Sequence, residues 1–455
     1  MAAPCVSCET GAPLRVVEFF SGVGGLHCAV KESGIASVVV AAVEINTVAN
    51  AVYRHNFPEV NLLQRNLEGF STDDFDSFEA DMIVMSPPCQ PFTRVGLKGD
   101  KNDARTNAFF NIMRNLPKMW KKPRYILVEN VKGFETSETR NFLAETLEKC
   151  QYTFQEFLLS PLDIGIPNQR LRYFLLAKQR PLPFNPEQGL ELLPHRITPT
   201  SAPSSVEPCD LANEVSSLAV DNPSTVSSKS QSNAEESVSV TSVSPTSATD
   251  CNAASASERT EPICHMTTKD QTSKSHEQKL KCDVKWLEEQ NRDAHDSKSD
   301  MRTRNAKGGK ARRKIVSYLQ SDLTEDSVAQ YLIPDRILLK FGKVMDIVTP
   351  EDTKTCCFTK AYAHYVEGTG SVLRTDFSTE MSEAFSEEDL PEEERMTRLR
   401  SLNLRYFTPR EMANLHHFPQ DFGFPETTTK KQLYRLIGNS LNVTLVAELI
   451  KYLVT

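Results

Sequence analysis

The chain has 455 residues with a formal net charge of −8, and 39% of its residues are hydrophobic. This is enough for a sizeable core and for two or three domains of roughly 100–200 residues each, and the acidic balance argues mildly against a surface that is basic throughout. No run approaches the roughly 18 apolar residues of a membrane span, and the opening MAAPCVSCET lacks a basic head and an apolar stretch, so neither a membrane partner nor a secretory signal is expected.

The cysteines indicate the compartment. There are eleven, an odd number without paired spacing. This pattern suits a reducing environment better than a disulfide framework. We therefore expect a cytoplasmic protein, with the nucleus as a further location.

The first part of the chain alternates short apolar runs with amphipathic stretches. The runs are LRVVEFF, SVVVAAVE, DMIVM, RYILVEN and RYFLLA. Continuous apolar runs of this length are typical of strands buried on both faces of a parallel sheet. The stretches between them, at 47–56, 106–120 and 139–150, predict helices. After a flexible tail at 1–12, we expect residues 13–185 to form a doubly wound α/β domain with a mostly parallel, Rossmann-like sheet.

Residues 186–312 break this pattern. Between 185 and 285 there is no Phe, Tyr or Trp, and Ser, Thr, Pro, Asn and Glu dominate. Such a segment cannot bury enough apolar surface to offset the entropy of ordering it, so we predict a disordered insert. A basic run at 302–314 would contact RNA phosphate or direct nuclear import, and a solvated linker end is the alternative.

The remainder predicts a small target-recognition domain over 313–400 and a C-terminal segment over 401–455 that completes the first domain. Residues 318–348 predict helices, whereas 356–373 are rich in β-formers. Thr408-Pro409 resembles the capped start of a helix, and the chain closes with a turn at GNS and a last helix. His416 and His417 are interpreted as solvated helix residues because no second ligand pair lies nearby, and no metal is expected.

The first chemical motif, FFSGVGG, lies between the first apolar run and a helix expected to begin near Leu26. Its glycines let a ligand approach the backbone at the carboxyl edge of the sheet, although it is not the GxGxxG pattern of a pyrophosphate site. Glu44 ends the next apolar run and could accept hydrogen bonds from ribose hydroxyls. Together they favour a nucleoside-containing cofactor; an ordinary turn beside an exposed acid is the alternative.

The second motif is Pro87-Pro88-Cys89, which ends the run DMIVM. Prolines fix φ and donate no backbone hydrogen bond, so this turn is held stiffly outside the ladder. A free cysteine is usually a small buried hydrophobe, but the residues after Cys89, Gln90 and Pro91, offer little apolar surface. A pre-positioned nucleophilic thiol is therefore favoured.

Two more motifs place charges at strand ends. Glu129-Asn130-Val131 ends RYILVEN, where nearby apolar residues could raise the pKa of the carboxyl and make it a general acid. Arg170 and Arg172 share one face of the strand that follows, which suits a phosphate or a polarised base oxygen. An ordinary strand-terminal acid and two solvated arginines are the alternatives.

In this order, the blocks resemble the cytosine-5 methyltransferase family: a FxGxGG-type loop, PPC, ENV, QRxR and a C-terminal GNS. The resemblance covers 14–178 and 403–452. The strings PPCQPFTRVG, Cys357-Phe358-Thr359 and GNSLNV are similar to the branch that methylates cytosine thirty-eight in the anticodon loop of tRNA-Asp. The resemblance therefore implies a tRNA partner, and we expect a monomeric enzyme.

The same resemblance assigns residues to the chemistry. Cys89 would add to carbon 6 of cytosine, Glu129 would protonate ring nitrogen 3, and Arg170 or Arg172 would hold the base. The implied methyl donor is S-adenosyl-L-methionine. Its implied contacts are Phe19, Val23, Gly24, Gly25, Glu44, Leu67, Glu68, Ser86, Asn439 and Ser440.

Two alternatives keep part of this interpretation. A DNA cytosine-5 methyltransferase would use the same site, but a duplex base must be extruded, whereas a loop cytosine is already unpaired. A catalytically silent nucleic-acid-binding protein is the other alternative. Intact Cys89, Glu129 and Arg170 argue against it, because a binding module has no need of a nucleophile.

Overall fold

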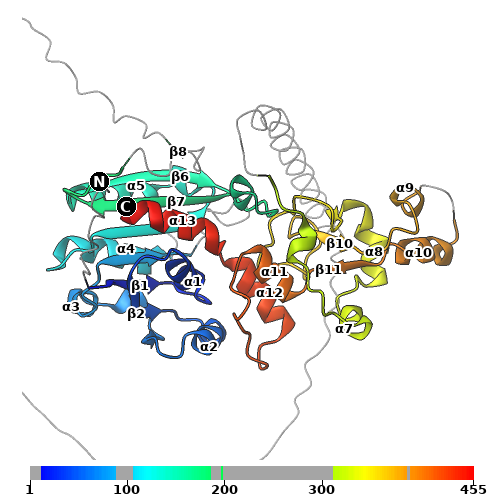
Figure 1. Cartoon of the computed structure of the whole chain (residues 1–455), viewed down its shortest axis with the longest axis horizontal. Helices are drawn as coiled ribbons and strands as arrows, with labels where there is room; N and C mark the ends of the chain where they lie inside the picture. The colour runs from blue at the N-terminus through cyan, green and yellow to red at the C-terminus, as the bar shows by residue number, and fades with distance from the viewer. Residues whose placement is uncertain (1–11, 89–105, 186–195, 198–310, 387–389) are drawn as a thin grey trace, which may run out of the picture. The chain divides into compact units, whose positions relative to one another are not determined.

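The computed structural model describes residues 12–88, 106–185, 196–197, 311–386 and 390–455 (Figure 1). All of these belong to one compact unit, which joins Met1–Pro199 to Met301–Thr455. Almost all of the predicted tail at 1–12, almost all of the predicted insert at 186–312, and Cys89 lie outside the described residues.

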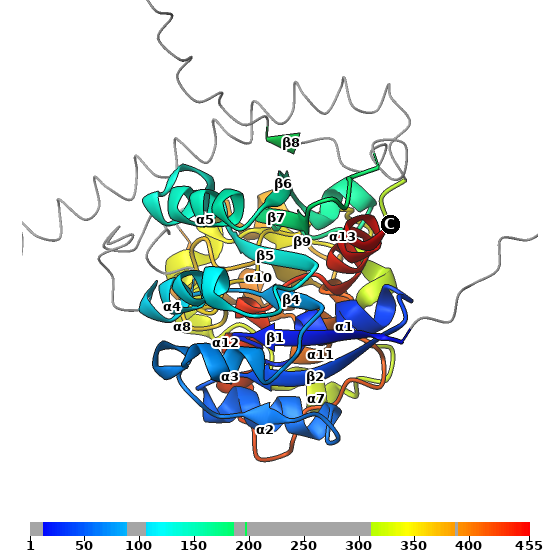
Figure 2. The same ribbon diagram turned by 90° about the vertical axis from the view of Figure 1, so that its left-hand side faces the viewer.

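The main element is an eight-stranded sheet with the order β3-β2-β1-β4-β5-β7-β6-β8. Figure 2 shows this order running from β8 at the top to β2 near the bottom. β1 to β5 pair in parallel, whereas β7 is antiparallel to both of its neighbours. The bounds are β1 (Leu14–Phe19), β2 (Ser37–Val43), β3 (Leu62–Leu63), β4 (Met82–Met85), β5 (Tyr125–Val131), β6 (Tyr152–Leu159), β7 (Arg172–Gln179) and β8 (Arg196–Ile197).

Helices cover both faces of this sheet, so the predicted doubly wound, mostly parallel fold is confirmed. Consecutive strand residues join opposite cores: Val16 packs in one and Val17 in the other. This is the period-2 alternation of a strand that is buried on both faces. One face carries α1 (Gly25–Glu32), α2 (Thr47–Asn56) and α13 (Val443–Val454); the other carries α3 (Thr72–Asp76), α4 (Asn107–Asn115) and α5 (Glu138–Lys149).

β6 is the long strand that the hydrophobic pattern does not reveal. Its sequence YTFQEFLL is interrupted by Gln155 and Glu156. Glu156 is nonetheless buried, because its carboxylate pairs with Arg140 and accepts a hydrogen bond from the Tyr173 hydroxyl at 2.6 Å. A buried acid with two partners can occupy a core position that a sequence pattern assigns to a surface.

β7 runs against the parallel strands. It pairs antiparallel with both β5 and β6, and residues 160–171, which include a 3₁₀ turn at Pro161–Ile164, join it to β6. The amino end of β7 therefore lies at the same edge as the carboxyl ends of the parallel strands.

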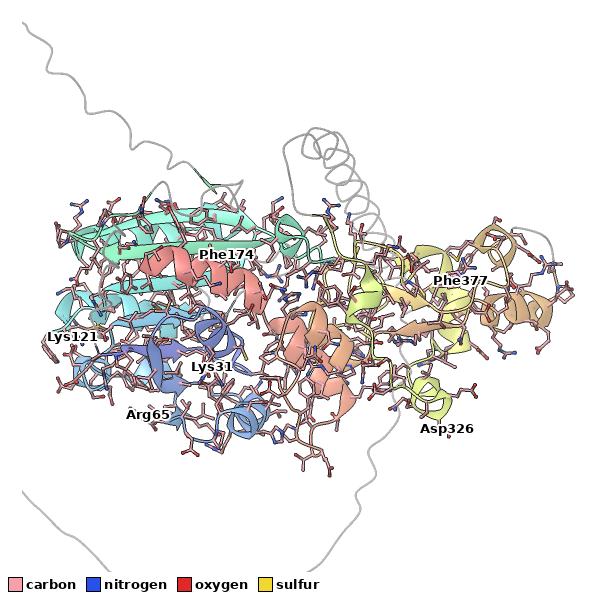
Figure 3. All side chains as sticks on the ribbon, viewed as in Figure 1. Lys31, Arg65, Lys121, Phe174, Asp326 and Phe377 are labelled. Carbon is pink, nitrogen blue, oxygen red and sulfur yellow. The ribbon has the colours of Figure 1, made fainter. Side chains whose placement is uncertain are left out.

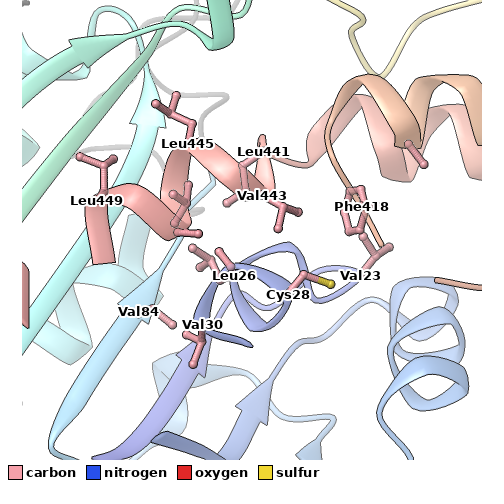
Figure 4. Close-up of a cluster of buried hydrophobic side chains, with 14 of the residues drawn as sticks. Val23, Leu26, Cys28, Val30, Val84, Phe418, Leu441, Val443, Leu445 and Leu449 are labelled. Carbon is pink, nitrogen blue, oxygen red and sulfur yellow. The ribbon is translucent and has the colours of Figure 1, made fainter. Parts of the chain in front are cut away.

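The C-terminal helix completes the larger domain. Figure 4 shows Leu445 and Leu449 of α13 beside Leu26 and Val30 of α1, next to Val84 of β4. The helix before it, α12 (Lys430–Asn439), occupies residues that the sequence assigned partly to a turn. The turn itself is confined to Ser440–Asn442, where Asn442 caps α13 by accepting from the Leu445 amide at 2.9 Å.

The remaining elements surround a three-stranded sheet with the order β11-β10-β9. The β-rich prediction for 356–373 is largely wrong, because only β10 forms there and turns fill the rest. The bounds are β9 (Ile347–Val348), β10 (Val372–Arg374), β11 (Leu404–Tyr406), α7 (Glu325–Ala329), α8 (Asp335–Phe341), α9 (Met381–Ala384), α10 (Glu392–Arg400) and α11 (Pro409–Leu415), with further 3₁₀ turns at Leu67–Gly69, Leu116–Lys118, Phe134–Thr136, Ile315–Tyr318 and Gly342–Val344.

α11 confirms one expectation and corrects another. Thr408 forms a capping box with Glu411, with bonds of 3.1 and 2.9 Å. The interpretation of His416 as solvated is wrong: it is fully buried, its Nδ1 lies 2.8 Å from the Met412 carbonyl oxygen, and burial lowers its pKa to about 3. His416 is a neutral core residue.

None of the helices in the described ranges is long and apolar enough to cross a membrane. In the same ranges, no group of three or more His, Cys, Asp and Glu side chains is arranged to hold a metal ion.

Gly438 provides a test of the packing around α12. A Cβ there would lie 2.3 Å from the Thr359 carbonyl oxygen and 2.7 Å from the Lys360 amide nitrogen. Because these are backbone atoms, Gly438→Ala should destabilise the fold by about 1–3 kcal/mol and lower the Tm in calorimetry. Gly69→Ala is the matched control, since nothing lies within 4 Å of its added Cβ. Equal Tm values for the two variants would contradict this packing.

Candidate active site

A cavity of about 540 Å³ lies where the parallel strands end, within the usual size of a small-molecule site. The turns after β1, β2 and β4, together with the end of β5, form one side of it. Arg170 and Arg172, at the amino end of the reversed strand β7, together with Leu436 and residues 438–441, also line it. Strand ends thus bring together residues that are far apart in the chain.

The predicted cofactor residues are distributed unevenly around this cavity. All except Phe19 and Gly24 line it. The Phe19 ring is buried in the core, with its centroid 5.7 Å from that of Phe75, and its neighbour Phe20, at φ 55°, lines the cavity instead. Gly24 faces away: an added Cβ would lie 2.5 Å from the Phe57 ring.

Glu44 joins the first two turns. Its Oε2 accepts from the Gly22 amide at 3.0 Å, and its Oε1 accepts from the amides of Ile45 and Asn46 at 2.9 and 2.8 Å. These bonds fix the carboxylate at the cavity wall. Ile45 beside it also lines the cavity and is 63% exposed, so it offers apolar surface that a planar ring could cover.

The donors and acceptors fit S-adenosyl-L-methionine. Ser21 lines the cavity, and its buried hydroxyl has no hydrogen-bond partner among the described residues. A buried polar atom of this kind is usually satisfied by a partner, and a ligand in the cavity would provide one. Leu67 and Glu68 add an apolar and a polar contact to the lining, and Asn439 and Ser440 offer further polar groups.

Two hydrogen bonds fix the turn after β4. The Asn130 amide donates to the Pro87 carbonyl oxygen at 3.4 Å, and the Ser86 hydroxyl donates to that of Phe20 at 3.4 Å. Pro87 and Pro88 line the cavity. Cys89 follows Pro88 directly but lies outside the described residues, so its role stays a prediction. Asn130 is thus a positioning residue, a role that its place in the Glu129-Asn130-Val131 motif does not reveal.

Glu129 faces Arg172 at the same edge. Its Oε1 lies 3.5 Å from the Arg172 Nε, and only 9% of the residue is exposed. Burial raises the pKa of the Glu129 carboxyl, Arg172 and Arg170 lower it, and the balance leaves it above the ordinary value. A raised pKa makes a carboxyl better suited to hold and donate a proton, as a general acid does.

Arg170 holds segments rather than pointing freely into the cavity. It is 3% exposed, and its guanidinium donates to the carbonyl oxygens of Phe358 at 3.0 Å, of Gly438 at 3.2 Å and of Ser440. The same group lies 3.4 Å from the Cys357 sulfur. Burial would raise the pKa of that thiol, but Arg170 and Arg172 bring it below its ordinary value.

A buried acid supports the first turn from the core side. Glu18 is fully buried, and burial raises its pKa to about 8. The Tyr53 hydroxyl lies 3.0 Å from Glu18 Oε2, and the His27 Nδ1 lies 2.8 Å from that hydroxyl. Glu18 therefore acts as a neutral hydrogen-bonding group beneath the glycine turn at neutral pH.

Comparison with known proteins agrees with this geometry. The profile of the family described as "C-5 cytosine-specific DNA methylase" matches residues 14–455. A mouse "tRNA (cytosine(38)-C(5))-methyltransferase" is 44% identical over 97% of this chain and 93% of its own length. A Dictyostelium discoideum "DNA (cytosine-5)-methyltransferase" is 35% identical over 97% and 94%. The crystal structure of a Spodoptera frugiperda DNMT2 mutant has a TM-score of 0.64 and 31% identity, covering 97% of this chain and all of that one.

Glu44 provides the first test of the cofactor site. Glu44→Gln keeps the shape of the side chain but removes its negative charge. The new amide N–H group also faces one of the backbone amides that donate to the carboxylate in the wild type. Because hydrogen bonds to charged groups contribute about 1.5–3 kcal/mol, the Kd for S-adenosyl-L-methionine should rise about tenfold or more in calorimetric titration. Glu59→Gln, at an exposed acid away from the cavity wall, is the control. An unchanged Kd for Glu44→Gln would remove this residue from the site.

Proposed function

The chain belongs to the C-5 cytosine-specific DNA methylase family, and on that premise we propose that it methylates carbon 5 of a cytosine in transfer RNA. One observation carries the proposal. A single cavity wall holds the fixed carboxylate of Glu44 and the buried pair Glu129 and Arg172, and it includes Pro88, the residue before Cys89.

The chemistry needs a nucleophile because carbon 5 of cytosine reacts poorly on its own. Addition of the Cys89 thiolate to carbon 6 makes the ring an enamine, which is nucleophilic at carbon 5. S-adenosyl-L-methionine supplies an activated methyl group when it is bound. Departure of the carbon 5 proton and of the thiolate then restores the aromatic ring.

Glu129 supports the addition step. Negative charge develops on the ring as the thiolate adds, and a proton donated by Glu129 to ring nitrogen 3 neutralises it. Arg172, 3.5 Å away, orients that carboxyl and can bind the base oxygen. Arg170 donates hydrogen bonds to the carbonyl oxygens of Phe358, Gly438 and Ser440 and so fixes the segments around the site relative to one another.

The substrate within this chemistry is an RNA. The mouse relative named as a tRNA methyltransferase spans nearly the whole of this chain. A loop cytosine is already unpaired, so less work is needed to place it in the cavity. Within transfer RNA we propose cytosine thirty-eight of tRNA-Asp, acted on by a monomeric, cytoplasmic enzyme that can also enter the nucleus.

DNA is the second candidate substrate. The Dictyostelium relative named as a DNA methyltransferase is 35% identical over nearly the whole chain. The reaction on DNA would use the same residues, and a direct comparison of substrates separates the two candidates.

The substrate test is transfer of labelled methyl from S-adenosyl-L-methionine, offering unmodified tRNA-Asp, a second tRNA and cytosine-containing duplex DNA side by side. We expect label in tRNA-Asp alone, and none with Cys89→Ala, which should still bind the cofactor because it removes only the nucleophile. Label in DNA instead would transfer the proposal to the second candidate. Turnover by Cys89→Ala would overturn the mechanism.

The acid role of Glu129 predicts a specific pH dependence. If the protonated carboxyl is the active form, kcat/KM falls as pH rises through its raised pKa. Arg172→Gln removes a cation that lowers this pKa, so the alkaline limb of the profile should move to higher pH. Glu129→Gln should lose about 10²-fold in kcat and lose that limb.

The control for this profile is Arg336→Gln, at an exposed arginine of α8. It should leave the limb in place. A wild-type kcat/KM that rises rather than falls as pH passes through this pKa would mean that the ionised form of Glu129 is the active one, and a limb that does not move in Arg172→Gln would contradict the assignment to Glu129.

A further inference from the structure

The segment between residues 359 and 369 forms a closed loop. The Thr359 amide donates to the Thr369 carbonyl oxygen at 2.9 Å, which joins the two ends. Inside the loop, the Tyr365 amide donates to the Ala361 carbonyl oxygen at 3.1 Å, and the Thr369 hydroxyl donates to that of Tyr365 at 2.6 Å. Such internal bonding fixes the loop without regular secondary structure.

One face of this loop is packed into the core. Tyr362 is buried, and its hydroxyl donates to the Ser371 carbonyl oxygen at 2.6 Å and accepts from the Phe407 amide at 2.9 Å. Gly370 allows this packing, since an added Cβ would lie 2.7 Å from the rings of both Phe358 and Tyr362. The underside of the loop is therefore immobilised.

The other face presents aromatic rings to solvent. Tyr365 is 64% exposed and His364 is also exposed, and their ring centroids lie 4.7 Å apart at 68°. Ala363, just before them, has φ 60°, a left-handed conformation that is unfavourable for alanine. Backbone strain of this kind persists where the surroundings enforce it and is frequent at functional sites. Lys360, at the base of the loop, is exposed as well.

This loop begins at the wall of the cavity. The Thr359 carbonyl oxygen lies against Gly438, and the Phe358 carbonyl oxygen accepts from Arg170. Gly438 and Arg170 both line the cavity. Tyr365 follows Thr359 by six residues, a span of about 20 Å at most and less in a closed loop. The exposed rings thus belong to a loop that is anchored at the cavity wall.

We propose that Tyr365, supported by His364, is a stacking platform for the unpaired bases that flank the target cytosine in the RNA substrate. The inference rests on the proposed function. Proteins bind unpaired RNA by stacking bases on exposed aromatic rings, and cations beside the rings attract the backbone. Tyr365 and Lys360 provide these two groups on a loop whose other face is fixed in the core.

Two substitutions distinguish the Tyr365 ring from its hydroxyl group, and measurements of Kd and kcat distinguish RNA binding from methyl transfer. Tyr365→Ala removes the ring, whereas Tyr365→Phe keeps it. With tRNA-Asp as the substrate, Tyr365→Ala should raise KM and the Kd of the RNA roughly tenfold, with kcat at saturating RNA within about twofold and cofactor Kd unchanged. Tyr365→Phe should stay close to wild type.

Trp120→Ala is the control for loss of an exposed ring. Trp120 is 69% exposed, and its neighbour Lys121 (labelled in Figure 3) pairs with Asp81 at 3.2 Å, just before β4 and therefore at the opposite edge of the sheet from the cavity. It should leave RNA binding unchanged.

Each outcome decides a different claim. If wild type methylates tRNA and Tyr365→Ala has an unchanged KM, the platform is wrong while the proposed function stands. If Tyr365→Phe is as weak as Tyr365→Ala, the hydroxyl rather than the ring is responsible, which also overturns stacking. A wild type that binds and methylates no tRNA overturns the proposed function, and the platform with it.

Discussion

The arrangement of the site depends on the buried guanidinium of Arg170. It donates to carbonyl oxygens of Phe358, Gly438 and Ser440, which lie 188, 268 and 270 residues further along the chain. A buried cation is costly unless its donors are satisfied, so these carbonyls must stay in place around it. Arg170 therefore fixes the segment at Phe358, the end of α12 and the amino end of β7 relative to one another. The cavity wall and the loop at 359–369 depend on this arrangement.

The topology then gives each group its place. Parallel strands deliver Glu44, Pro88 and Glu129 to one edge of the sheet, because all of these follow or end a strand that runs in the same direction. The reversed strand β7 brings its arginines to that edge from the opposite direction. A carboxyl and a guanidinium therefore meet at 3.5 Å although they belong to different strands. Electrostatic pre-organisation of this kind is what an acid-assisted addition needs.

The sequence predicts the parts of the site that follow strands and misses those set by tertiary packing. The apolar runs reveal β1, β2, β4, β5 and β7, and the motif order places the cavity at their ends. β6 was missed because the buried Glu156 breaks its hydrophobic pattern, and His416 was misplaced because its burial depends on distant segments. Phe19 and Phe20 cannot be told apart by pattern, since only the turn at φ 55° decides which ring faces the cavity.

The central claim is that a cytosine of transfer RNA is attacked by Cys89 at this cavity. The most direct measurement offers the enzyme and S-adenosyl-L-methionine a tRNA-Asp that carries 5-fluorocytosine at the target position. Fluorine cannot leave carbon 5 as the proton does, so the thiol should stay bonded to carbon 6. We predict a protein–RNA adduct that survives denaturation, maps to Cys89 by mass spectrometry and is absent in Cys89→Ala. No adduct with the RNA, or an adduct only with fluorinated DNA, would contradict the account.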